Sequence, residues 1–177
     1  MNPWPDLRPI LAGISWAITG AVATRAYMPE RMTQDLDILV HRADCQVVWQ
    51  RFQAAGYKLS SVLDAPYFVA RSPDGVEVDV ICADFPWLQE ALTTPQHDLA
   101  NYPVLDFPYL IIMKLMANRG IDIGDMTRML GLASPEQLDR VQALVAHYSP
   151  QDSEDLQALI LLGQLEMEPP DGKQWLG

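Results

Sequence analysis

Two aspartates stand two positions apart in an otherwise apolar run, DLDILV at residues 35–40. The alternation and the β-branched residues predict a strand, on which residues i and i+2 point to the same face. Asp35 and Asp37 therefore project together, and two ionised carboxylates that close repel each other unless a cation lies between them. A pair of divalent ions about 3.5–4 Å apart can clamp the oxygens of a phosphoryl transfer. The geometry of Asp35 and Asp37 matches such a two-metal site.

A third carboxylate, Asp79, lies in a second apolar strand, VEVDVI at 76–81, with Glu77 on the same face. Upstream, ITGAVAT at 18–24 indicates the end of a strand, then Gly20, then the start of a helix, where backbone N–H groups can face a phosphate. Each feature alone is typical of a turn or a solvated strand edge. Their order along the chain favours a phosphoryl-transfer site that Asp79 completes.

The predicted elements change character halfway along the chain. The SPDG turn at 72–75 predicts antiparallel pairing of the strands on either side of it. We expect strands at 15–19, 35–40, 57–62, 67–72, 76–83 and 102–107, helices at 21–28, 44–56 and 85–94, and then helices at 109–120, 122–132, 134–148 and 153–167. The expected fold class is α/β (α+β). A small mixed β-sheet core flanked by helices would span 1–107, and a C-terminal helical subdomain packed on it would span 108–177.

The composition narrows the class of protein. At 177 residues and 49% apolar, the chain can bury a sizeable core. Its two cysteines, Cys45 and Cys82, lie in apolar surroundings, so we expect buried thiols rather than a disulfide or a zinc site. A net charge of -11 disfavours broad, nonspecific nucleic-acid binding. We expect a cytoplasmic protein with no membrane segment, because no apolar run reaches about 18 residues and no signal-peptide pattern opens the sequence.

Together the motifs resemble the nucleotidyltransferase superfamily in its minimal bacterial form. Its pattern of hG[GS], hDh[DE]h and a later h[DE]h matches Thr19-Gly20-Ala21, the Asp35–Asp37 stretch and Val78-Asp79-Val80. RMTQDLDILV, with Arg31 and Thr33 before the first aspartate, resembles the R-x-T-x-D-[IL]-D-[IL] stretch of the family. FPYLIIMKLMANRGIDIGDMTRML resembles a segment of AbiEii-type nucleotidyltransferases. The resemblance covers about residues 15 to 132.

The resemblance implies a Mg²⁺-dependent enzyme that transfers a nucleoside monophosphate from an NTP to an acceptor hydroxyl on tRNA, a protein or a small molecule. It also implies a toxin–antitoxin or phage-defence setting with a cognate partner. Asp35 and Asp37 would bind Mg²⁺, and Asp79 would complete the metal site and deprotonate or position the attacking hydroxyl. The implied nucleotide-binding residues are Gly20, Ala21, Thr33, Lys114, Asp122 and Asp125, with Lys114 on the triphosphate and the last two aspartates shaping the nucleotide or acceptor pocket.

Two positions depart from the family pattern. Gly20-Ala21 replaces GG or GS, and Ile121 replaces the lysine that often opens the last motif. They leave open a catalytically degenerate nucleotide-binding or protein-binding module of the same fold. Structural roles also stay open for Lys114, as a buried side chain that reaches outward, and for Asp122, as a first-turn acid. An aminoglycoside-type transferase is a further alternative, because no short motif marks the acceptor pocket.

Overall fold

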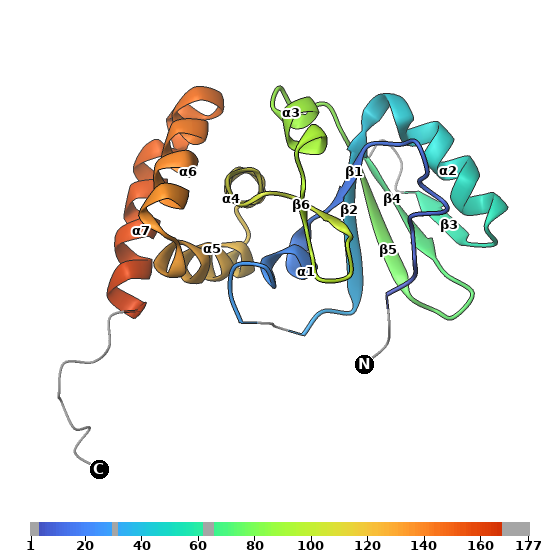
Figure 1. Cartoon of the computed structure of the whole chain (residues 1–177), viewed down its shortest axis with the longest axis horizontal. Coiled ribbons are helices and arrows are strands. Elements are labelled where there is room, and N and C mark those ends of the chain that lie inside the picture. The colour runs from blue at the N-terminus through green and yellow to red at the C-terminus, as the bar shows by residue number, and fades with distance from the viewer. Residues whose placement is uncertain (1–3, 30–31, 62–65, 168–177) are drawn as a thin grey trace, which may run out of the picture. The chain divides into compact units, whose positions relative to one another are not determined.

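The computed structural model describes residues 4–29, 32–61 and 66–167. The chain divides into two compact units, Met1–Leu110 (unit 1) and Ile111–Gly177 (unit 2) (Figure 1). The boundary predicted from the sequence falls at 107/108. Within the described residues, no helix combines the length and the apolar character needed to cross a membrane.

Unit 1 is built on a seven-stranded mixed sheet with the order β3-β4-β5-β2-β1-β7-β6. Its strands are β1 (Trp16–Ile18), β2 (Asp35–His41), β3 (Lys58–Ser61), β4 (Tyr67–Arg71), β5 (Glu77–Ala83), β6 (Gln96–His97) and β7 (Pro103–Val104). The antiparallel pairing of β4 with β5 confirms the expectation from the SPDG turn, while β2 and β5 run parallel. The predicted mixed α/β class is therefore confirmed.

The central strands bury one face of the sheet and leave the other more open. Leu36, Ile38, Val78 and Val80 are at most 1% exposed, whereas the residues that alternate with them at the start of β2 and β5 are half-buried acids. Helix α2 (Cys45–Ala54) covers the apolar face, and the ring of its Phe52 lies 6.2 Å from that of Phe68 on β4. The sheet thus has an apolar face under α2 and an acid face, which carries Asp35, Asp37 and Asp79.

The cysteines correct a prediction. Cys45 and Cys82 form a disulfide that joins the first residue of α2 to β5. They lie 37 positions apart in the sequence, and no motif indicates that this helix begins directly over that strand. Apolar surroundings predicted two buried thiols, but the packing of α2 on the sheet brings the two sulfurs together.

The remaining elements of unit 1 follow the sequence with local differences. Helix α1 (Gly20–Thr24) is shorter than the predicted 21–28, and α3 (Leu88–Thr93) follows β5. The strand β6, which pairs antiparallel with β7, was missed. Two residues are too few to show an alternating pattern.

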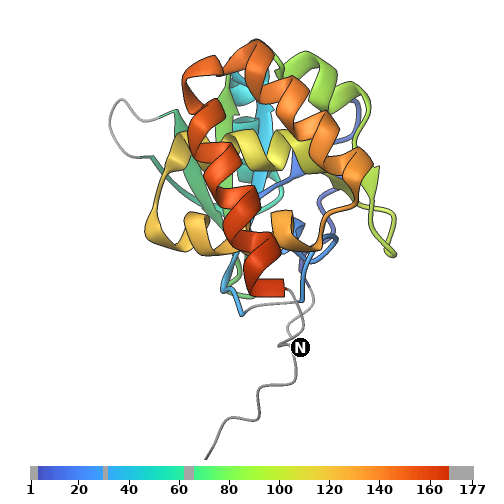
Figure 2. The ribbon, with the colours of Figure 1, turned by 90° about the vertical axis from the view of Figure 1, so that its left-hand side faces the viewer.

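Unit 2 is helical. It contains the C-terminal part of α4 (Phe107–Ala117), then α5 (Gly120–Leu132), α6 (Pro135–Tyr148) and α7 (Ser153–Met167). The predicted cap of α6 is confirmed, because the Ser134 hydroxyl accepts a bond from the Gln137 N–H in a full capping box. Figure 2 shows α7 crossing α5. Gly131 of α5 and Gly163 of α7 lie in close contact. A Cβ at Gly131 would lie 2.3 Å from the Gly163 carbonyl oxygen, so the close crossing requires the glycine.

Candidate active site

The predicted acids share the acid face through the register of β2 and β5. Asp37 lies directly beside Asp79, and Asp35 lies beside Glu77. All four side chains are half-buried, and neighbouring residues at the same level of adjacent strands project to the same face. The face therefore brings four carboxylates together at the start of two parallel strands.

Burial and the clustering of carboxylates change the pKa of Asp79. Burial, then the negative charge of Asp35 and then that of Glu77 raise the pKa of the Asp79 carboxyl above its ordinary value. A carboxyl with a raised pKa is a better proton acceptor, and a cation placed beside it would lower that pKa again. The acid face therefore has both a candidate base and an attraction for cations.

Gly20 makes room for Asp37. It begins α1 with a φ of +61°, and a Cβ at this position would lie 1.8 Å from the Asp37 Oδ2 atom. The neighbouring Thr19 N–H donates to the Asp37 carbonyl oxygen at 2.9 Å, which holds the end of β1 to β2. Any side chain at residue 20 would displace the Asp37 carboxylate. Ala21, the next residue, is buried. The pattern Gly-Ala keeps the one glycine that the geometry requires.

Asp35 is oriented by a residue that lies just before its strand. The Thr33 hydroxyl donates a hydrogen bond to Asp35 Oδ1. Thr33 therefore contacts the first aspartate, and its contact with a nucleotide stays a prediction. Arg31 lies outside the described residues.

The donor set suits a hard cation. Three aspartates from two adjacent strands offer only carboxylate oxygens, the ligands that Mg²⁺ prefers. The space left by the missing Cβ of Gly20 admits the Asp37 carboxylate beside α1. Among residues 4–29, 32–61 and 66–167, no three His, Cys, Asp or Glu side chains already stand in a metal-binding arrangement. The carboxylates therefore suit the ion by donor chemistry and by their shared face, not by a preformed arrangement.

The predicted residues of unit 2 form a separate, internally paired cluster. The Lys114 Nζ donates to Asp122 Oδ1 at 2.9 Å and to Asp125 Oδ2 at 2.8 Å, and all three residues are at most 4% exposed. Arg119 adds a bond from Nε to Asp122 Oδ2 at 2.6 Å. Burial acts to raise the pKa of Asp122, but hydrogen bonds from Arg119 and Lys114 outweigh it and leave that pKa below its ordinary value. Contact of Lys114 with a triphosphate stays a prediction. In the structure its ammonium group donates to Asp122 and Asp125 instead.

Sequence reasoning missed Arg71. Its guanidinium forms an ion pair with Glu77, directly across the β4–β5 pair. Counting outward from the turn at 72–75 would have placed the two residues opposite each other. This pair extends the charged groups of the acid face by one strand.

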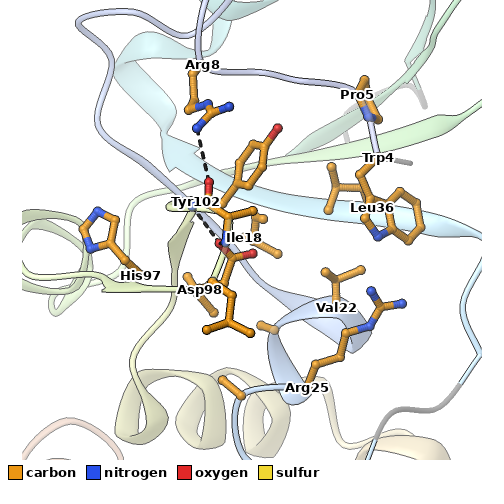
Figure 3. Close-up of a pocket in the computed structure, with 15 residues that line it drawn as sticks. Trp4, Pro5, Arg8, Ile18, Val22, Arg25, Leu36, His97, Asp98 and Tyr102 are labelled. Atoms are coloured by element: carbon orange, nitrogen blue, oxygen red, sulfur yellow. Dashed lines mark hydrogen bonds between the residues drawn. The ribbon is translucent and has the colours of Figure 1, made fainter. Parts of the chain in front are cut away.

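Unit 1 also contains a cavity of about 890 Å³, formed by the N-terminal segment, α1 and the β6–β7 hairpin (Figure 3). Leu36 lines it, and because Leu36 alternates with the two aspartates of β2, the cavity opens on the opposite face from the acids. The Arg8 guanidinium stacks on Tyr102 at 4.6 Å and donates to the Ala100 carbonyl. None of the predicted site residues lines this cavity.

Solved structures with a similar fold include antibiotic-resistance proteins. The antibiotic-resistance factor ANT(2'')-Ia is 16% identical, with 92% of each chain covered and a TM-score of 0.50. The same factor in complex with adenylyl-2"-tobramycin is 16% identical over 90% of this chain and 95% of that chain, with a TM-score of 0.48. The lincomycin-bound lincosamide antibiotic adenylyltransferase LnuA is 12% identical over 78% of this chain and 90% of that chain, with a TM-score of 0.47.

No protein-family model matches the sequence, and a search of curated proteins gave no match either. At 16% identity, the likeness to ANT(2'')-Ia concerns the backbone rather than the side chains. It agrees with the mixed seven-stranded sheet. The chain therefore has the nucleotidyltransferase fold.

Proposed function

We propose that this protein is a nucleotidyltransferase that moves a nucleoside monophosphate from an NTP to an acceptor hydroxyl and releases pyrophosphate. The observation that carries the proposal is the alignment of Asp35, Asp37 and Asp79 on one face of two adjacent strands, beside Gly20. The nucleotidyltransferase fold supports the same reaction class.

Each aspartate has a distinct role in the proposal. Asp35 and Asp37, with Asp79 completing the set, would hold two Mg²⁺ ions, which would supply charge neutralisation for the phosphate oxygens. Asp79 also receives the proton of the attacking hydroxyl or orients that hydroxyl. The N–H groups of Gly20 and Ala21, next to Asp37, contact the nucleotide phosphates.

Membership of the AbiEii-type nucleotidyltransferases is the finer part of the proposal. It rests on the resemblance of residues 107–130, and it extends the acceptors to tRNA, a protein or a small molecule. A cognate toxin or antitoxin partner and a phage-defence role belong to the same proposal. In it Lys114, Asp122 and Asp125 serve the nucleotide or acceptor.

One observation favours a second candidate. The buried Lys114 is already neutralised by two carboxylates, and no described trio of acids is preassembled for a metal. This is compatible with a degenerate nucleotide-binding or protein-binding module. Such a module would bind Mg²⁺ and an NTP without turnover.

The test is transfer of label from each of the four α-³²P NTPs to total tRNA, to candidate proteins and to aminoglycosides. Asp35→Asn/Asp37→Asn should reduce transfer by about 10³-fold or more, because it removes the ligands of the charge-stabilising ions. The matched control is Asp84→Asn/Asp139→Asn, which removes two exposed carboxylates elsewhere and should retain transfer.

Wild-type transfer by the Asp35→Asn/Asp37→Asn variant would refute the proposal. Thermal stabilisation by NTP and Mg²⁺, with no transfer to any acceptor, would favour the binding module instead.

A further inference from the structure

Four charged side chains form a single row across four strands of the acid face. The registers of β2 with β5, β5 with β4 and β4 with β3 align them at one level of the sheet. Opposite residues on neighbouring strands project to the same face. We call this set the charged row: Asp35, Glu77, Arg71 and Lys58.

The charges in the row are segregated. Two carboxylates occupy the central strands, and two cations occupy the outer strands β4 and β3. Glu77 pairs with Arg71, but Lys58 lies directly opposite Arg71 and forms no ion pair with any other described residue. Like charges directly opposite each other on an antiparallel pair destabilise it. The outer half of the row therefore has one more cation than the described residues neutralise.

The outer half of the row is accessible. The Arg71 side chain is 57% exposed and the Glu77 side chain 40% exposed, and Lys58 is exposed as well. The residues that alternate with them, Phe68 and Ala70, are buried on the apolar face. With an overall charge of -11, the chain offers few such cationic surfaces.

The row lies within reach of the candidate base. Asp79 is on the next level of the sheet, beside Val69 on β4. Diagonal neighbours on adjacent strands are separated by about 7–8 Å, so Asp79 and Arg71 can contact two groups of one small molecule. Lys58 lies one strand further out.

We propose that Arg71 and Lys58 bind a phosphate group of the acceptor, so that the acceptor is a phosphorylated molecule with its hydroxyl at Asp79. This rests on the proposed function. A guanidinium has five N–H donors, so Arg71 can keep its bond to Glu77 and still donate to a phosphate. Glu77 is then a positioning residue that holds Arg71 toward the acceptor.

The transfer conserves atoms and charge. The acceptor oxygen forms a bond to the α-phosphorus of the NTP, and the bond from that phosphorus to the bridging oxygen of pyrophosphate breaks. The hydroxyl proton passes to the Asp79 carboxylate, and pyrophosphate leaves. The phosphate at Arg71 and Lys58 is unchanged and serves only to place the hydroxyl.

The test reverses both cations, as Arg71→Glu/Lys58→Glu. The matched control is Arg42→Glu/Arg128→Glu, which makes the same change in net charge at two exposed positions away from the row. Binding of AMP and of a short RNA is followed by NMR in the presence of Mg²⁺, and the two probes separate a free phosphomonoester from a phosphodiester strand. The Arg71→Glu/Lys58→Glu variant should weaken binding of the preferred probe about tenfold or more, because charge-assisted bonds to phosphate are lost. The control should bind like the wild type.

A second experiment measures KM of the transfer reaction for phosphorylated and for unphosphorylated acceptors. The Arg71→Glu/Lys58→Glu variant should raise KM for the phosphorylated acceptor and leave KM for the NTP unchanged. Equal losses in both double variants, or no loss in either, would overturn the inference and leave the cations as ordinary edge-strand charges. A binding loss confined to Arg71→Glu/Lys58→Glu, without transfer by the wild type, would support the phosphate site and count against the proposed reaction.

Discussion

Both units contain clustered aspartates, but the charges around them differ in sign, and so do the resulting pKa shifts. On the acid face of unit 1, Asp79 is affected by burial, by Asp35 and by Glu77, and all three raise its pKa. In unit 2, Asp122 is more deeply buried, yet its hydrogen bonds from Arg119 and Lys114 lower its pKa. A carboxylate that accepts hydrogen bonds from cationic side chains stabilises the folded protein. A carboxylate that faces other carboxylates is destabilised when ionised, and a bound cation would relieve that repulsion. The two clusters of the same residue type therefore differ in whether cationic side chains already neutralise them.

The largest expected effect is in unit 2. Asp122→Asn leaves the buried Lys114 with one carboxylate, and breaking a buried pair costs about 3–5 kcal/mol of unfolding free energy. Chemical denaturation should show this loss, while Asp139→Asn, at an exposed position, should change stability little.

The pH dependence of that loss follows from the lowered pKa. The stabilising contribution of Asp122 is complete above the ordinary value of 3.8 and disappears as the pH falls through its lower folded pKa. The gap between wild type and Asp122→Asn should therefore close in acid. Equal stability of the two proteins at neutral pH would mean that the buried cluster contributes nothing.

The next effect compares two glycines of unit 1. Gly13 and Gly20 both have positive φ, at +76° and +61°, but a Cβ at Gly13 would meet nothing within 4 Å. Gly13→Ala should cost only the left-handed backbone strain, about 1–2 kcal/mol. Gly20→Ala adds a clash with Asp37, worth about 1–3 kcal/mol more, and should also impair Mg²⁺ binding. Equal costs at the two positions would show that Asp37 does not need the space beside α1.

The smallest effect has the opposite sign. Asp79→Asn should stabilise the metal-free protein by about 0.2–1 kcal/mol, because it removes a like-charge contact between strands. Since the folded pKa of Asp79 lies above 3.8, the wild type loses stability as the pH rises through that range, and the Asn variant does not. The two denaturation curves should coincide in acid and separate toward neutral pH. A destabilised Asn variant at pH 7 would place Asp79 among the structural acids.

Local patterns predicted the elements well. Alternation in DLDILV and VEVDVICA predicted β2 and β5, and the SPDG turn predicted the pairing that sets the register of β5. Together these place Asp35, Asp37 and Asp79 on apolar strands. Only the structure shows that β2 lies next to β5 and that Asp37 falls beside Asp79.

Contacts between distant segments were not predictable in the same way. The Cys45–Cys82 disulfide depends on the angle at which α2 crosses the sheet, which leaves no local pattern. Lys114 was expected to contact phosphate, and its buried carboxylate partners lie on the following helix α5. A sequence shows that a lysine lies on an apolar helix, but not which acid neutralises it.

The central claim is that the acids of unit 1, rather than those of unit 2, bind a divalent cation. Titration with Mn²⁺, observed as paramagnetic broadening of backbone amide signals, compares the two clusters in one experiment. The account predicts that broadening begins at Asp35, Asp37 and Asp79 and is abolished by Asp35→Asn/Asp37→Asn. Broadening that starts at Asp122 and Asp125, or that persists unchanged in the double variant, would contradict it.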